Sequence, residues 1–174
     1  GLWDRLTIAI VADHGELFGE HNCFRHSYHF WDDNLRVPFI LRSPWITGGQ
    51  GVIEPRLFQG VDVAPTLLDL ASVSTGDWRP SGVSAIDTLT GPVTRGWDRP
   101  VFSEIRAFGI RRWMVRRGDF KYLRFAPTHM DRLKKRYKKS WEDLLSTHHE
   151  DTREFLFDLG QDPDERTNLR AQMP

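Results

Sequence analysis

The sequence has a single cysteine, no long apolar run and no excess of charge of either sign. Cys23 is alone among 174 residues, so no disulfide can form within the chain. This fits a reducing compartment, but exported proteins often lack disulfides too, so the compartment stays open. No apolar run approaches the roughly 20 residues that cross a bilayer as a helix, so we expect no membrane partner.

Neither terminus of the sequence resembles a natural chain end. No signal peptide is present, but the chain starts at Gly1 without a methionine and stops at Pro174 directly after a turn-like segment. We therefore expect a piece of a longer protein, whose localisation and oligomeric state this sequence leaves open.

Charge is balanced, with 24 basic and 24 acidic side chains, so composition favours no nucleic-acid partner. One basic stretch, residues 132–139, could bind an anionic ligand. Apolar residues recur around it at helical spacing, from Met130 to Leu145. A solvated face of an amphipathic helix is therefore the favoured interpretation.

The first part of the chain alternates strand and helix signals, which is typical of an α/β layer. Residues 6–12 are a nearly continuous apolar run, as in a strand of a parallel sheet that is buried on both faces. Residues 37–41 form a second short strand. Residues 62–71 read as a helix, with Asp62 able to cap it and Pro65 tolerated in the first turn.

The second part reads as an antiparallel sheet. Short strands are predicted at the ranges 100–103, 110–117, 120–125 and 155–159, with Gly118-Asp119 as a hairpin turn. A boundary is placed within the Gly/Pro/Thr-rich stretch 88–98. The predicted organisation is therefore an α/β domain at 1–95 and a small antiparallel β subdomain with a helix at 96–174.

Chemistry-bearing side chains follow the first predicted strand directly. Ligands of open α/β sheets bind at the carboxyl ends of strands, and Asp13 and His14 occupy such an end. Carboxylate and imidazole both bind divalent cations, and Gly15 eases a turn that would let them converge. The alternative is an ordinary Asp-His-Gly turn that caps a helix.

A second polar cluster follows at residues 19–26, with His29 close behind. Its imidazole and guanidinium groups could hold an oxyanion by charge-assisted hydrogen bonds. An ordinary polar surface loop is the competing interpretation. Cys23 could in principle be an activated thiol, but a lone cysteine beside a phenylalanine is more often simply packed.

Several stretches, in order along the chain, resemble the second half of the sulfatase family of the alkaline phosphatase-like superfamily. They are residues 7–16, 19–21, 35–40, 61–71, 82–84, 155–159, 162–165 and 168–169. The resemblance spans nearly the whole chain. It implies the C-terminal part of the α/β core of that fold plus a small antiparallel subdomain.

The resemblance also implies a site. Asp13 and His14 would be ligands of a divalent cation, calcium in many sulfatases, with manganese or magnesium as alternatives. His26 would contact the substrate's sulfate; this position is found by counting back from residues 36–38, which match the family. If that alignment is shifted by one residue, Arg25 takes the same role. The family's nucleophile is a formylglycine, made from the Cys or Ser of the motif C/S-x-P/A-x-R. This motif is absent from the present sequence, and the residues around Cys23 do not match it. We therefore expect the nucleophile upstream of this chain.

Three functions remain open on these grounds. The first is a fragment of a sulfuric-ester hydrolase, inactive alone, whose parent acts on a sulfated small molecule or glycan. The second is a phosphodiesterase or phosphonate monoester hydrolase on the same scaffold. The third is a non-catalytic anion-binding module with residues 134–139 as its cationic face.

Overall fold

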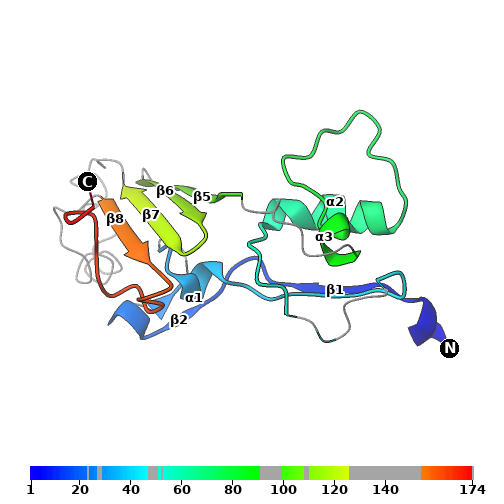
Figure 1. Ribbon diagram of the computed structural model, residues 1–174, viewed down its shortest axis with the longest axis horizontal. Coiled ribbons are helices and arrows are strands. Elements are labelled where there is room, and N and C mark those ends of the chain that lie inside the picture. The colour runs from blue at the N-terminus through cyan, green and yellow to red at the C-terminus, as the bar shows by residue number, and fades with distance from the viewer. Residues whose placement is uncertain are drawn as a thin grey trace. The chain divides into compact units, whose positions relative to one another are not determined.

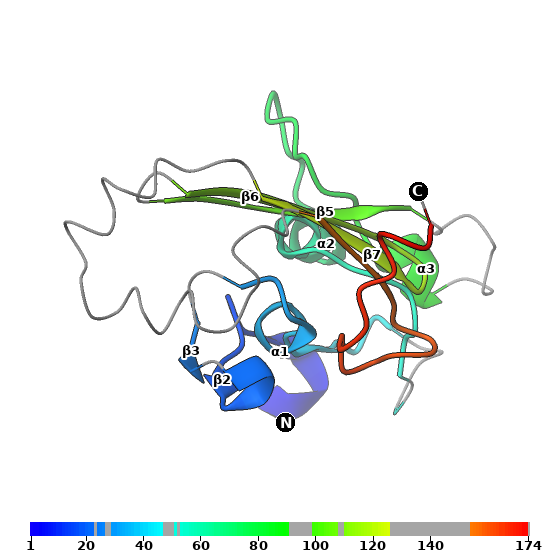
Figure 2. The same cartoon turned by 90° about the vertical axis from the view of Figure 1, so that its left-hand side faces the viewer.

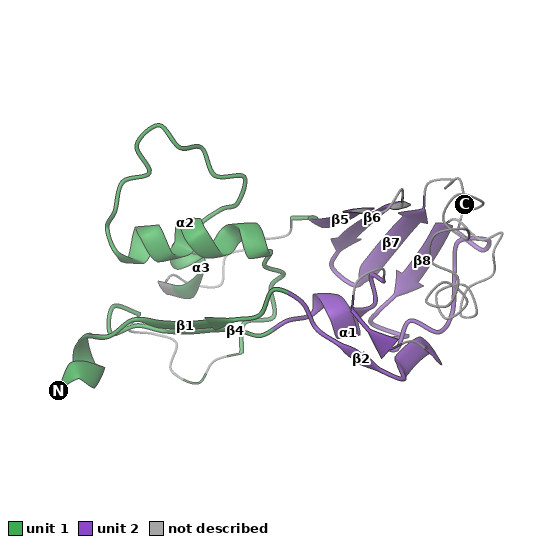
Figure 3. Ribbon diagram, turned by 180° about the vertical axis from the view of Figure 1, so that it is seen from behind, with its two compact units in different colours: residues 1–13, 38–101 green, residues 14–37, 102–174 purple. Residues whose placement is uncertain are grey.

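A computed structural model of the chain describes residues 1–22, 24–26, 29–46, 51, 53–90, 99–107, 110–125 and 154–173. The chain divides into two compact units (Figure 3). Unit 1 comprises residues 1–13 and 38–101, and unit 2 comprises residues 14–37 and 102–174. Unit 2 thus includes residues 14–37, which the predicted division at 1–95 and 96–174 assigned elsewhere; that division remains a prediction.

A two-stranded antiparallel ribbon is the first element of unit 1 (Figure 1). It follows the 3-10 turn η1 (Leu2–Arg5) and pairs β1 (Ile8–Val11) with β4 (Phe39–Arg42). Both strands were predicted, and they pair with each other antiparallel, whereas the apolar run at residues 6–12 was expected to suit a parallel sheet. Ile10 is 54% exposed, so β1 is not buried on both faces by the described residues. Apolar runs report a tendency to be buried and carry no information on strand direction.

The helices of unit 1 are α2 (Gly60–Leu70) and α3 (Ile86–Thr90). The first begins two residues before the predicted start, because Gln59 is its N-cap and Asp62 occupies its first turn. The Asp62 carboxylate accepts hydrogen bonds from the backbone N–H of Gln59 at 2.8 Å and of Val83 at 2.9 Å, and it pairs with Arg99. Asp62 is fully buried. It therefore fixes the helix start and the loop at residues 82–84 together.

A four-stranded antiparallel sheet forms the framework of unit 2. Its strands, in spatial order, are β5 (Val101–Ala107), β6 (Ile110–Arg117), β7 (Phe120–Phe125) and β8 (Glu154–Asp158). The predicted hairpin is confirmed, since Arg117 pairs with Phe120 and Gly118 has a φ of 57° between them. Positive φ is the conformation in which glycine avoids steric cost. The helix predicted between Met130 and Leu145 lies outside the described residues.

Residues 14–37 are called the histidine segment here, because they hold four of the seven histidines. The segment contains β2 (Leu17–Phe18), the 3-10 turn η2 (Glu20–Asn22), β3 (Phe24–Arg25) and α1 (Asp32–Leu35). Strands β2 and β3 pair as a short hairpin. Figure 2 shows the histidine segment along one face of the four-stranded sheet.

An apolar core attaches the histidine segment to that sheet. The segment contributes Leu17, Phe30 and Trp31, each at most 4% exposed. The sheet and the residue after it contribute Met114, Leu123, Phe155, Phe157 and Leu159. Burying one such side chain stabilises a fold by about 1.5–3 kcal/mol. The core thus holds a segment distant in sequence firmly against β7 and β8.

The residues after β8 are tied back to it by one asparagine. Asn168 Oδ1 accepts from the backbone N–H of Leu156 at 3.0 Å, and its amide nitrogen donates to the backbone oxygen of Glu154 at 3.1 Å. Leu169 adds a backbone hydrogen bond to Leu156 at 2.8 Å. The motif at residues 162–169 therefore has a structural role, because it holds the segment after β8 against that strand.

No helix among the described residues has the length and apolarity to span a bilayer.

Candidate metal centre

Asp13 and His14 follow β1 directly, as the sequence predicts. The strand ends at Val11, and the N–H of Ala12 still contacts the carbonyl oxygen of Pro38 at 3.4 Å. Asp13 closes the first stretch of unit 1, and His14 opens unit 2. The two side chains thus stand where the chain passes from the ribbon to the histidine segment.

One hydrogen bond defines which nitrogen of His14 can face a cation. His14 Nδ1 lies 2.8 Å from the carbonyl oxygen of Gly15. A carbonyl oxygen only accepts, so Nδ1 carries the proton and the lone pair of the neutral ring is on Nε2. Metal-binding histidines commonly donate their other ring N–H to a backbone carbonyl in this way. The donor chemistry of His14 therefore fits a divalent-metal ligand.

Gly15 fixes the backbone beside His14 by close approach to α1. Its N–H donates to the carbonyl oxygen of Asn34 at 2.8 Å. A Cβ at this position would lie 1.9 Å from the carbonyl oxygen of Asp33, closer than any real contact. The sequence suggested a glycine needed for a turn; the structure shows that it is needed for space.

The structure brings His14 and His26 together. Their rings stack with centroids 3.9 Å apart and planes inclined by 22°. His26 Nδ1 also lies 2.8 Å from a carboxylate oxygen of Glu16. Because the two predicted site histidines are 12 residues apart in sequence, this stack is the main structural support for a shared site. It places the His26 ring directly beside that of His14.

Arg25 ends β3 and is exposed, with a φ of 75°. A positive φ is uncommon for a residue with a side chain and often accompanies a functional constraint. Cys23, for which the sequence leaves packing as the favoured role, lies outside the described residues.

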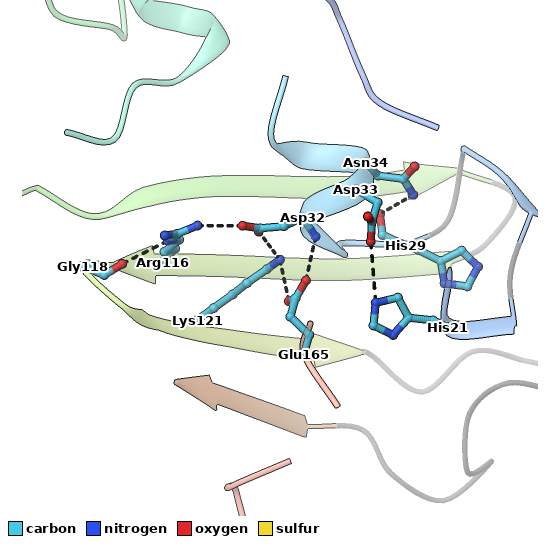
Figure 4. A network of polar contacts seen from close by, with 9 residues as sticks. All are labelled: His21, His29, Asp32, Asp33, Asn34, Arg116, Gly118, Lys121 and Glu165. Atoms are coloured by element: carbon cyan, nitrogen blue, oxygen red, sulfur yellow. Dashed lines mark hydrogen bonds and ion pairs between the residues drawn. The ribbon is translucent and has the colours of Figure 1, made fainter. Parts of the chain in front are cut away.

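His21 has a structural environment distinct from the stacked pair. Its ring stacks on Trp31 at 4.0 Å between centroids, with planes inclined by only 11°, and its Nε2 lies 3.7 Å from Asp33 (Figure 4). Burial lowers the pKa of His21, although the nearby Asp33 carboxylate acts in the opposite direction. A ring stacked on a core tryptophan indicates packing rather than binding.

A buried group of charges was missed by the sequence reasoning. We call it the Lys121 cluster: Asp32, Arg116, Lys121 and Glu165 (Figure 4). Lys121 Nζ lies 2.8 Å from Asp32 and 2.7 Å from Glu165. Arg116 contacts the other oxygen of the same aspartate at 2.9 Å. Burial raises the pKa of Glu165, while its partner Lys121 partly offsets this.

The sequence did contain a signal for this cluster. Alternate residues of a strand share a face, so Lys121 must share one with Leu123. Both side chains are almost completely buried. A lysine on the apolar face of a strand requires a buried anionic partner. No local pattern indicated that these partners are Asp32, 89 residues before Lys121, and Glu165, 44 residues after it.

A complete metal centre is not formed by the part of the chain that the structure describes. Within residues 1–22, 24–26, 29–46, 51, 53–90, 99–107, 110–125 and 154–173, no three or more His, Cys, Asp or Glu side chains are grouped so that they could hold an ion. Asp13 and His14 could contribute to such a centre only together with ligands from elsewhere.

Comparison with known proteins identifies the family. The family model described as Sulfatase matches residues 1–73. The Delta 4,5-hexuronate-2-O-sulfatase of Bacteroides thetaiotaomicron is 31% identical over 93% of this chain and 30% of its own length. The choline-sulfatase of Rhizobium meliloti is 31% identical over 95% of this chain and 27% of its own length.

The fold agrees with these similarities. A solved 2-O GAG sulfatase superimposes with a TM-score of 0.71 and 27% identity, over 94% of this chain and 31% of that protein. The chain therefore spans less than a third of the length of each of these relatives. Family model, sequence relatives and solved structure agree with each other and with the predicted resemblance, so the chain belongs to the sulfatase family, within the alkaline phosphatase-like superfamily.

Proposed function

We propose that this chain supplies part of the divalent-metal and sulfate site of a sulfuric-ester hydrolase. The observation that supports the proposal most is the stack of His14 on His26, since it joins a predicted metal ligand to a predicted sulfate contact. The formylglycine nucleophile and the remaining metal ligands belong to the rest of the parent protein. The chain alone is then expected to turn over no substrate.

Asp13 and His14 are the proposed contribution to the metal. Carboxylate oxygen suits Ca²⁺, Mg²⁺ and Mn²⁺, whereas imidazole suits transition metals better than Ca²⁺. Asp13 is thus the ligand in every case, and His14 Nε2 is a ligand to manganese or a close neighbour of calcium. A divalent cation at this place would withdraw charge from an ester oxygen as a Lewis acid.

The proposed role of His26 is to bind the sulfate group. Its Nδ1 lies against the Glu16 carboxylate, which orients the ring and leaves Nε2 for the anion. With Nδ1 donating to Glu16, Nε2 donates to an oxyanion in the doubly protonated ring. Arg25, one residue earlier and permanently charged, is the second candidate for the same contact.

The substrate is proposed only by class, a sulfated small molecule or glycan. Relatives are named for a hexuronate 2-O-sulfate, for choline sulfate and for a GAG 2-O-sulfate. The sulfate ester is the group that all of these molecules share. A site in this chain that contacts metal and sulfate would serve each of them.

Metal content of the full-length parent tests the proposal. Purified wild-type protein is compared with Asp13→Ala and His14→Ala by elemental analysis and by titration with Ca²⁺ and Mn²⁺. We expect Asp13→Ala to lose bound metal, and His14→Ala to bind at least about tenfold more weakly. The matched control is His21→Gln, which removes an imidazole from the same segment at a position packed on Trp31. Normal metal content in both site variants would overturn the proposal.

The reaction class is tested separately on paired sulfate and phosphate esters of one alcohol. Preferential sulfate ester hydrolysis that requires the metal supports the sulfatase reading. Preference for the phosphate ester would assign the parent to the phosphodiesterase and phosphonate hydrolase branch instead. Metal-independent, salt-sensitive heparin binding without hydrolysis would indicate an anion-binding module.

A further inference from the structure

The Lys121 cluster lies at the join between the histidine segment and the sheet. Lys121 belongs to β7, Glu165 to the segment after β8, and Asp32 is the first residue of α1 (Figure 4). The lysine side chain is 0% exposed and that of Glu165 is 1% exposed. None of these groups belongs to the proposed metal and sulfate site.

Both charge and hydrogen bonding in the cluster converge on Asp32. Its two carboxylate oxygens face Lys121 at 2.8 Å and Arg116 at 2.9 Å, and its backbone N–H donates to Glu165 at 2.7 Å. Two cations and two carboxylates balance formally. Buried charges are costly unless paired, so the cluster strongly favours one position of the first turn of α1.

From α1 the contacts lead directly to His14. The carbonyl oxygen of Asn34, two residues after Asp32, accepts the N–H of Gly15 at 2.8 Å. Gly15 lies so close to α1 that a Cβ there would collide with its backbone, and its own carbonyl oxygen accepts a hydrogen bond from His14 Nδ1. A displacement of α1 must therefore move the backbone group that sets the tautomer and orientation of His14.

We propose that Lys121 and Glu165 are positioning residues for the metal site, acting through Asp32 and α1 on the Gly15 carbonyl and so on His14. This rests on the proposed function, because it assumes that His14 takes part in metal binding. Partners that orient a ligating histidine typically contribute ten- to a hundredfold in metal affinity. Lys121 would reach the same magnitude from farther away because every intervening contact is packed or hydrogen-bonded.

The test measures Ca²⁺ and Mn²⁺ dissociation constants of the full-length parent, at a temperature where circular dichroism shows each variant fully folded. Lys121→Met keeps the length of the side chain and removes its charge. Glu165→Gln keeps the size of the side chain and removes its charge. It tests the same effect on metal binding if Lys121→Met does not fold. We expect both to weaken metal binding about tenfold or more per folded molecule.

The matched control is Arg99→Gln in unit 1. It breaks another pair with a fully buried carboxylate, that of Asp62, and it belongs to unit 1, whereas α1 belongs to unit 2. It should lower thermal stability as the cluster variants do and leave the metal dissociation constants unchanged. This separates positioning from general loss of stability.

Two outcomes overturn the inference, and they are distinguishable. If Lys121→Met and Glu165→Gln bind metal like wild type while His14→Ala does not, the cluster has only a structural role and the proposed function stands. If His14→Ala itself binds metal normally, the proposed function fails and the inference fails with it. Weaker metal binding in the cluster variants but not in Arg99→Gln supports the inference.

Discussion

At the scale of single residues, Gly15 is held closer to α1 than any residue with a side chain could be. The nearest atoms to a Cβ at this position are backbone atoms of Asp33 and Asn34, which cannot rotate away as a side chain could. Close backbone approach is one of the few roles that only glycine can perform.

We therefore expect Gly15→Ala to destabilise the fold by about 1–3 kcal/mol, the usual cost of overpacking. Urea unfolding followed by circular dichroism measures the change. Gly60→Ala is the control, since nothing lies within 4 Å of a Cβ there and alanine is the better helix former. Its expected effect is neutral or stabilising by up to about 1 kcal/mol. Equal effects of the two substitutions would show that Gly15 and α1 are not in contact.

His21 gives a prediction for pH dependence. Burial lowers its pKa, so below about pH 6.5 the unfolded chain binds a proton that the folded protein does not. Folding stability is therefore lost as the pH falls through that value, and the loss ends once the pH is below the folded pKa. Above about pH 7 both states are neutral at His21, and it contributes no slope.

The prediction is tested by comparing wild type with His21→Gln, because Glu165 changes folding stability with pH in the opposite direction to His21. The pKa of Glu165 is raised in the folded protein, so at pH values just above the ordinary glutamate pKa the folded protein binds a proton that the unfolded chain does not. The contribution of Glu165 to folding stability therefore declines as the pH rises through this range. Unfolding free energies from about pH 5 to 7 should fall less steeply with acidification in His21→Gln than in wild type. Identical slopes in the two proteins would contradict a lowered pKa of His21 in the folded protein.

At the scale of elements, the residues after β8 behave as an added strand-like segment held by a side chain. Asn168 satisfies the backbone of Glu154, Leu156 and Arg170 at once. One amide side chain has both donor and acceptor capacity, which no apolar or charged residue of that size offers.

Asn168→Leu should therefore destabilise unit 2 by about 2–4 kcal/mol, because several partly buried backbone groups lose their partner. Hydrogen exchange should report it locally, with faster exchange of the Leu156 and Leu169 amides. Arg166→Gln is the control in the same segment, since its pair with Asp164 is exposed and such pairs contribute about 0–1 kcal/mol. Unchanged exchange at Leu156 would show that the asparagine does not hold the segment.

Local patterns predicted these elements well where local chemistry decides them. Strand β7 matches its predicted range, and the turn at Gly118 follows from a residue that tolerates positive φ. The helix start at Gly60 was missed by two residues, because Asp62 acts from inside the first turn instead of before it. Pairing of β1 with β4 was also missed, because strand direction depends on the path of the chain between strands.

At the scale of the whole molecule, contacts between distant residues were the hardest to predict. Asp13 and His14 could be singled out by their place after a strand, whereas the stack on His26 requires the fold of the histidine segment. The Lys121 cluster joins three segments that no local pattern connects. Family resemblance predicted where a site lies, and the structure shows which residues neighbour the predicted ones.

The chain spans less than a third of the length of each sulfatase compared with it. Under the proposed function, residues beyond this sequence complete the site, and Asp13 and His14 are the point at which this part of the protein meets the metal. All other proposals, including the positioning role of Lys121, depend on that one assignment.

A crystal structure of the full-length parent, with its metal located by anomalous scattering, tests the assignment most directly. We expect the ion about 2.0–2.6 Å from a carboxylate oxygen of Asp13, with Nε2 of His14 and not Nδ1 directed toward it. A fully occupied ion bound at the sulfate site without Asp13, or His14 facing it through Nδ1, would contradict the account.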